Sequence, residues 1–377
     1  MANFIVSNRN DSGTGSLRDA IAQANSNTAG SLDTIVFSAS VFNDSTDVIE
    51  LTGADIDISQ PLIIRGNGAT TTIIDGKGND RIFNSSAELT LEGVTLQGGH
   101  TADNGGGVLS NSAITVIDST ISGNTSGDRG GGIYTTAAIT LTNSTVSNNS
   151  ATDNGGGIYG RNRLIEITNS TIAGNTSNRY GGGVHTRSQI IVADSTVSSN
   201  SSRRNGGGLY SRSGNLTVSD STISDNTSNR HGGGLWARSR TITIERSTVS
   251  GNSTRLSAGG TYAQTTNITE STISNNTSGD LGAGVYTTGT LRITDSTLSG
   301  NSSTNRGGGG YFRNNAEIQR STISGNSSAR GGGLHSRGGG TVNVSSSTIS
   351  GNSASNQGGG LFARGTGGGT INGSAAM

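Results

Sequence analysis

Residues 119–143 read STISGNTSGDRGGGIYTTAAITLTN, and this stretch decides the fold of the chain. A short apolar run around Ile121 is followed by a polar turn, a triple glycine, Ile133, and a further run at Ile139 and Leu141. The residues in the Ile121 position recur every 24 to 26 residues, at Leu96, Ile121, Val146, Ile172, Val197, Ile223, Val249, Ile273, Leu298, Ile323 and Ile349. A fixed period in the twenties is typical of a solenoid, in which each repeat buries its apolar face by stacking on its neighbours.

The composition excludes several classes of protein. Only 29% of the 377 residues are hydrophobic, but they fall at fixed positions, which argues against disorder. The 25 basic and 25 acidic residues cancel, so we expect no nucleic-acid partner. Without cysteine there is no disulfide framework or thiolate site, and we expect no cofactor. No run is long enough to span a membrane as a helix, and the first residues lack the features of a cleaved signal peptide.

Residues 1–33 are predicted to form a cap. Ser16 and Asp19 have the spacing of a capping box, with Ser16 as the N-cap of a short helix. The apolar residues that follow have helical spacing, and they are Leu17, Ala20, Ile21 and Ala24. We expect this helix to cover the open end of the core; a surface helix without a capping role is the alternative.

The rest of the chain is predicted to form coils, irregular over residues 34–98 and regular over residues 99–377. Because strand side chains alternate, Ile133 and Thr135 should point inward and Tyr134 outward. Ile121, Ile139 and Leu141 should also point inward, so that each coil has three strands. The sequence therefore predicts an all-β fold, a right-handed single-stranded parallel β-helix with about 13 coils of about 25 residues and a short amino-terminal helical cap.

Two motifs carry a resemblance to known proteins. The pairing of Gly-Gly-Gly-Ile133 with Ile121-Ser-Gly-Asn124 resembles the repeat of chlamydial polymorphic outer-membrane proteins, which alternates GGA-aliphatic with FxxN motifs. Residues 15–21 and 33–37 are similar to the amino-terminal region of bacterial right-handed β-helix exoproteins. The resemblance implies a cell-surface or secreted protein of adhesion or the cell envelope, exported without a cleaved amino-terminal signal peptide.

Outward positions that repeat in every coil should form columns on the β-helix surface, because coils stack at roughly 4.8 Å. The residue after the inner aliphatic is aromatic in most coils, and this column comprises Tyr134, Tyr159, His185, Tyr210, Trp236, Tyr262, Tyr286, Tyr311, His335 and Phe362. Two positions further on, a column of arginines comprises Arg161, Arg187, Arg212, Arg238, Arg313, Arg337 and Arg364.

Three interpretations of this aromatic and arginine stripe remain open. It could be an interface through which the chain assembles with itself, because Tyr, Trp and Arg are typical interface anchors. It could bind an acidic surface polysaccharide, with rings against sugar faces and guanidinium groups on carboxylates or sulfates. It could also merely stabilise the fold through contacts between rings and cations.

Three other columns have simpler explanations. Thr120 and Ser122 begin an outward Thr/Ser array; such arrays occur in ice-binding solenoids, but they also suit any exposed strand. The column from Asn124 to Asn352 should be a stacked amide ladder that satisfies turn backbone groups. A turn position holds Asp118, Asp194, Asp220 and Asp295, but also Asn143, Asn169, Arg246 and Arg320. The arginines argue against a calcium column, and we expect no metal site.

Catalysis requires a unique constellation such as paired carboxylates, which a near-uniform repeat does not offer. We therefore expect no enzyme; the irregular coils near Asp55, Asp57 and Asp75 are the alternative place for one. The sequence favours a non-enzymatic cell-surface or secreted structural or adhesion protein, and self-assembly into a fibre through open β-helix ends is a further expectation. The alternative is a module that binds an acidic polysaccharide through the stripe.

Overall fold

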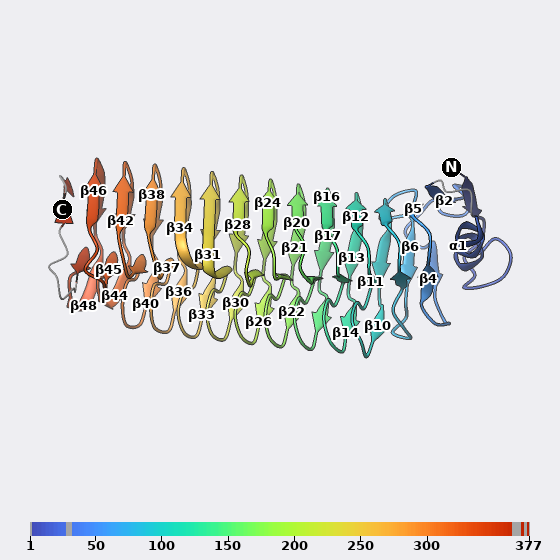
Figure 1. Cartoon of the computed structure of the whole chain (residues 1–377), viewed down its shortest axis with the longest axis horizontal. Coiled ribbons are helices and arrows are strands. Elements are labelled where there is room, and N and C mark those ends of the chain that lie inside the picture. Colours follow the sequence, from blue (N-terminus) through green and yellow to red (C-terminus); the bar gives the residue numbers. More distant parts are fainter. Residues whose placement is uncertain (1, 28–31, 364–370, 373–374, 377) are drawn as a thin grey trace. The chain divides into compact units, whose positions relative to one another are not determined.

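The computed structural model describes residues 2–27, 32–363, 371–372 and 375–376. It is an all-β parallel solenoid of about 13 coils with about 25 residues per coil and one short helix near the amino terminus, which confirms the predicted fold class (Figure 1). The contacts divide the chain into two compact units. Unit 1 comprises Met1–Asn178 and Gly183–Ser188, and unit 2 comprises Arg179–Gly182 and Gln189–Met377. Each unit is described by itself.

The amino-terminal segment of unit 1 combines a strand with the predicted helix. Strand β1 (Asn3–Val6) pairs in parallel with β2 (Asp33–Phe37), and helix α1 (Leu17–Ser26) lies between them in sequence. The Asp19 amide donates to the Ser16 hydroxyl over 3.2 Å, and the Asp19 carboxylate accepts from the Gly15 amide over 2.8 Å. This N-cap is the predicted one. The four apolar residues of α1 are buried, and the helix packs on β1, β2 and β4 (Ile56–Ile58) (Figure 1).

The regular coil has four short strands. In the coil that decides the fold they are β13 (Thr120–Ser122), β14 (Thr125–Ser126), β15 (Ile133–Thr135) and β16 (Ile139–Thr142). Each pairs in parallel and in register with the same run of the next coil, as Ile121 does with Val146 and Ile133 with Ile158. The predicted inward residues are buried. Strand β14 was not predicted, because its inward residue is Ser126, and a polar residue leaves no mark in the hydrophobic pattern.

The other strands that precede this coil in unit 1 are β3 (Val48–Glu50), β5 (Leu62–Arg65), β6 (Ile73–Asp75), β7 (Phe83–Ser85), β8 (Leu89–Glu92), β9 (Thr95–Gln97), β10 (His100–Thr101), β11 (Val108–Ser110) and β12 (Ile114–Ile117). In unit 2 the sheet that carries the aromatic residues comprises β24 (Ile190–Ala193), β27 (Leu209–Ser211), β28 (Leu216–Ser219), β31 (Leu235–Glu245), β34 (Thr261–Thr269), β37 (Val285–Thr287), β38 (Leu291–Thr294), β41 (Gly310–Phe312), β42 (Ala316–Gln319), β45 (Leu334–Ser336), β46 (Val342–Ser345) and β49 (Leu361–Ala363).

The asparagine column is a buried amide ladder in both units, as predicted. In unit 1 the side-chain amide of Asn124 donates to the Asn149 side-chain oxygen over 3.0 Å and to the Leu96 carbonyl over 3.2 Å. The same Asn149 oxygen accepts the backbone N–H of Asn124 over 2.9 Å. One residue per coil thus satisfies backbone groups of two neighbouring coils, which a buried turn requires.

A serine column forms a second buried ladder that sequence reasoning missed. The Ser119 backbone N–H donates to the Ser144 hydroxyl over 3.2 Å, and that hydroxyl donates to the Thr142 carbonyl over 2.7 Å. The residue before each serine has a left-handed backbone, with φ of 48° at Asp118 and 52° at Asn143. Asn and Asp tolerate this conformation best, which explains why they are frequent at the turn position.

Candidate functional site

The aromatic residues form stacked columns, as the repeat predicts. In unit 1 the rings of Tyr134 and Tyr159 are 5.2 Å apart and nearly parallel. In unit 2 the Tyr210 and Trp236 rings stack at 4.3 Å, and Tyr262 and Tyr286 at 4.6 Å. Each ring belongs to the residue after the inner aliphatic, so strand pairing from coil to coil fixes the spacing.

The expectation that these rings form an open stripe is wrong for most of them. Tyr134, Tyr159, His185, Tyr210, Trp236, Tyr286, Tyr311 and His335 are buried, and only Tyr262 and Phe362 are half-buried. The turn before each triple glycine covers the rings: Gly206 has φ of +66°, and a Cβ there would lie 2.8 Å from the Tyr210 Cβ. In unit 1 the Arg129 guanidinium lies 5.5 Å from the Tyr159 ring centre. The rings therefore make a second small core outside the main one.

A buried histidine in this core should make the protein sensitive to acid. The pKa of His335 is lowered to about 4, mainly because burial disfavours the imidazolium; the charges of Arg306 and Arg337 lower it further, whereas a backbone hydrogen bond with Arg330 opposes this shift. In the unfolded chain the imidazole takes up a proton near pH 6.5. The contribution of the neutral His335 ring to the free energy of unfolding is therefore fully present above pH 6.5, and it is lost as the pH falls toward about 4.

We expect His335→Phe to reduce this loss, because phenylalanine occupies the same position at residue 362 and does not titrate. The measurement is the free energy of unfolding in urea from pH 7.5 to 4. His231, whose pKa burial also lowers, keeps part of the dependence. Tyr311→Phe is the control and should leave the slope unchanged; an unchanged slope in His335→Phe would contradict the prediction.

The arginine columns are the exposed part of the predicted stripe. Arg161 and Arg187 in unit 1, and Arg212, Arg238, Arg313 and Arg337 in unit 2, have exposed side chains. None of these six guanidinium groups has an ion pair with a carboxylate in the described part of the chain. Arg364 lies outside the described residues. The structure thus leaves cations unneutralised on this face of each unit.

A groove interrupts the arginine column of unit 2, and sequence reasoning missed it. It has a volume of about 490 Å³, and among the residues that line it are Arg238, Tyr262, Gln264, Tyr286, Thr288 and Arg313. The corner of this coil spans only residues 264–265, between the inward Ala263 and Thr266, whereas the preceding coil uses residues 238–241. The signal in the sequence is the shortest repeat, the 24 residues between Val249 and Ile273.

The phenol groups of the groove are neutral donors at ordinary pH. Burial raises the pKa of Tyr286 to about 12 and also raises the pKa of Tyr262. The interaction with Tyr286 raises the pKa of Arg313 above its usual range. The groove thus presents two permanent cations with neutral hydrogen-bonding groups between them.

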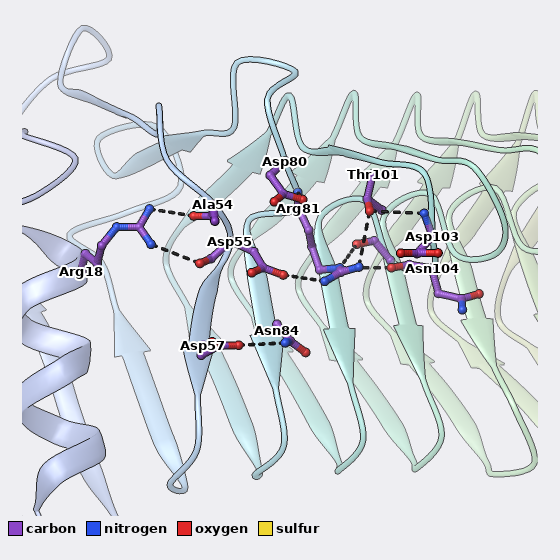
Figure 2. Close-up of polar contacts among 11 residues, drawn as sticks. Arg18, Ala54, Asp55, Asp57, Asp80, Arg81, Asn84, Thr101, Asp103 and Asn104 are labelled. Atoms are coloured by element: carbon purple, nitrogen blue, oxygen red, sulfur yellow. Dashed lines mark hydrogen bonds and ion pairs between the residues drawn. The ribbon is translucent and has the colours of Figure 1, made fainter.

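Carboxylates of the irregular first coils take part in structural contacts (Figure 2). Asp55 pairs with Arg81 over 2.5 Å, and the Asn84 side chain donates to Asp57 over 2.8 Å. Burial raises the pKa of Asp55, although Arg81 opposes this rise. Asp75 lies on β6, in a different sheet, and accepts from the Lys77 amide and the Gln97 side chain. The structure therefore does not gather the three aspartates into one site.

Arg81 is the centre of this cluster. Its guanidinium also donates to the carbonyls of Asn104 and Gly105 over 3.1 and 3.0 Å (Figure 2). Arg18 of α1 donates to the carbonyls of Ala54 and Asp55 and joins the helix to the same coil (Figure 2). These bonds tie successive coils together where the repeat is least regular.

Two further searches of the described residues give negative findings. No group of three or more His, Cys, Asp or Glu residues there is placed to hold a metal ion. Among the helices that the structure describes, none combines the length and the apolar character needed to cross a membrane.

Comparisons with known proteins agree with the observed architecture. The family model described as the right handed beta helix region matches residues 63–252 and 157–315. The model of the Chlamydia polymorphic membrane protein repeat matches residues 346–364, which suggests a surface-exposed protein. No match is found among curated proteins or among solved structures.

Proposed function

Because this chain belongs to the family of right-handed β-helix proteins, we propose that it is a non-enzymatic adhesion protein of the cell surface or the extracellular space. The observation that carries the proposal is the contrast between the interior and the arginine face. Every regular coil repeats the same buried ladders, whereas six arginine side chains stay exposed without a carboxylate partner in the described residues. Unpaired cations on a regular surface favour contact with anionic material outside the cell.

The match to the chlamydial repeat supports a location at the surface. Antibodies against the purified protein should therefore label intact cells of the source organism, with a cytoplasmic protein as the control. Labelling that appears only after permeabilisation would contradict the proposed location.

Adhesion is tested with the arginine columns themselves. Beads coated with the protein should adhere to surfaces coated with an acidic polysaccharide, and a variant with all six exposed arginines changed to glutamine should lose this adhesion. The six positions are Arg161, Arg187, Arg212, Arg238, Arg313 and Arg337. If both proteins adhere equally, the arginine columns do not mediate adhesion, and only the structural role of the aromatic rings remains for this stripe.

Assembly into fibres through the ends of the β-helix is a finer part of the proposal. Negative-stain electron microscopy of the purified chain tests it directly. Ordered fibres would support assembly, whereas a uniform population of single particles would favour adhesion by the individual chain.

A further inference from the structure

The groove of unit 2 arises from a local change in the path of the chain. Strands β31 and β34 are single long strands, where the other regular coils have two shorter ones (Figure 1). Their pairing joins Ala237 to Ala263 and Thr241 to Thr265, so residues 238–240 bulge outward opposite Gln264. The next coil approaches from the other side, where the Thr288 and Gly289 amides donate to the Ala263 and Gln264 carbonyls. The short corner at Gln264 is therefore recessed beside the bulge of residues 238–240.

The two arginines of the groove stand at its ends. The residues that precede them are in register across three pairings, from Ala237 to Ala263, to Thr287 and to Phe312. Arg238 and Arg313 are thus three coils apart, roughly 14 Å at about 4.8 Å per coil. Gln264 and Thr288 occupy the arginine position in the two coils between them. Among the residues that the structure describes, no acidic one lines the groove, so no carboxylate among them neutralises either guanidinium group.

At the floor of the groove only the edge of the Tyr262 ring is open, because the Trp236 and Tyr286 rings stack on its two faces at centroid distances of 6.0 and 4.6 Å. Tyr262 is half-buried, whereas its neighbours Trp236 and Tyr286 are buried. The side chains of Gln264, Thr288 and Asn314 add neutral donors and acceptors beside it. Its volume of about 490 Å³ falls within the range of small-molecule binding sites.

We propose that this groove binds an anionic sugar chain in which acidic and neutral sugars alternate. Two acidic groups of the chain pair with Arg238 and Arg313, and a neutral sugar between them contacts the open edge of the Tyr262 ring and the polar floor. A nucleic acid fits less well, because it carries a phosphate at every nucleotide and would place some of these charges over the uncharged floor. The inference rests on the proposed function in one respect: the protein must be outside the cell, where it meets such polymers.

Binding of purified full-length protein to defined oligosaccharides tests the inference. Hyaluronan tetrasaccharide, in which two carboxylated sugars alternate with neutral ones, should bind more tightly than chitin tetramer or a short oligodeoxythymidylate. Changing both Arg238 and Arg313 to glutamine should weaken binding at least about tenfold, because each charge-assisted hydrogen bond contributes to affinity. Gln264→Ala should also weaken binding, and because this side chain is exposed, an unchanged melting temperature is the check on folding.

The matched control changes Arg212 and Arg337, which lie in the same column of unit 2 outside the groove. It removes the same charge and should leave the affinity within about twofold, since exposed charges away from the ligand contribute little. Equal weakening by the two double variants, equal binding of chitin or oligodeoxythymidylate, or no binding of hyaluronan would each overturn the inference. Cell-surface labelling does not depend on these residues. An incorrect groove assignment would therefore change only the binding results, whereas an incorrect location would change only the labelling.

Discussion

Asn226→Asp should lower the free energy of unfolding of the protein by about 3–5 kcal/mol, the cost of a buried charge without a partner. Asn226 is fully buried in unit 2. Its side-chain NH₂ donates to the Val197 carbonyl and to the Asn252 side-chain oxygen, both over 2.9 Å. In the variant a carboxylate oxygen would face these two acceptors, and no donor would replace the lost one.

The hydrogen bonds that the Asn226 side-chain oxygen accepts should remain in the variant. Its side-chain oxygen accepts the backbone N–H and the side-chain amide of Asn200 over 3.0 and 2.9 Å. A carboxylate can accept both of these bonds, so the expected loss of stability comes only from the two bonds that the Asn226 NH₂ group donates. Protonation restores a donor, and burial should raise the pKa of the new carboxyl. The deficit relative to the unchanged protein should therefore shrink as the pH falls.

Urea denaturation at pH 7 and pH 4.5 measures the loss of unfolding free energy and its dependence on pH. Hydrogen exchange shows which coils open. Thr227→Asp is the matched control, because its side chain is exposed and directly follows Asn226. It should cost no more than about 1 kcal/mol, as expected for a surface substitution. If both variants lose the same unfolding free energy, or if the loss in Asn226→Asp does not change with pH, the amide ladder is not the cause of the lost stability.

The stacked columns could be predicted because one residue type recurs at one position in successive coils. Asn124 and Asn149 have no hydrophobic role, and only a ladder explains their period. The pair Gly310 and Phe312 follows the same logic: Phe312 is buried beside a position without a side chain, as the repeat implies. Period and alternation thus sufficed for three of the four strands of the coil, their inward residues and the amide ladder.

The burial of the rings could not be predicted from alternation alone. Alternation correctly places Tyr159 on the outer side of its strand, but it does not show what covers that side. The cover comes from the turn before the triple glycine, which approaches the strand closely at Gly155, where a Cβ would lie 2.9 Å from the Tyr159 Cβ. The groove was missed for a related reason, since it depends on one corner being shorter than its neighbours, at residues 264–265.

Arg81→Met should destabilise the irregular first coils by about 3–5 kcal/mol, because it leaves a carboxylate and two carbonyls without their donor. Arg81 is buried and pairs with Asp55, whose side chain is 19% exposed. The carbonyls of Asn104 and Gly105, on the next coil, accept from the same guanidinium. Methionine fills a similar volume but supplies no donor, so the loss reports the bonds rather than a cavity.

Hydrogen exchange over residues 50–110 is the measurement, because a repeat protein can open locally without unfolding as a whole. Arg65→Met is the matched control: its pair with Glu92 is exposed, and its loss should cost less than about 1 kcal/mol. The pKa of Asp55 is already raised by burial, and removal of Arg81 should raise it further. A raised carboxyl pKa destabilises the fold above that pKa, so the deficit should diminish as the pH falls. Asp55→Asn in the Arg81→Met background should recover part of the loss, and a double variant as unstable as the single one would show that the ion pair does not join these coils.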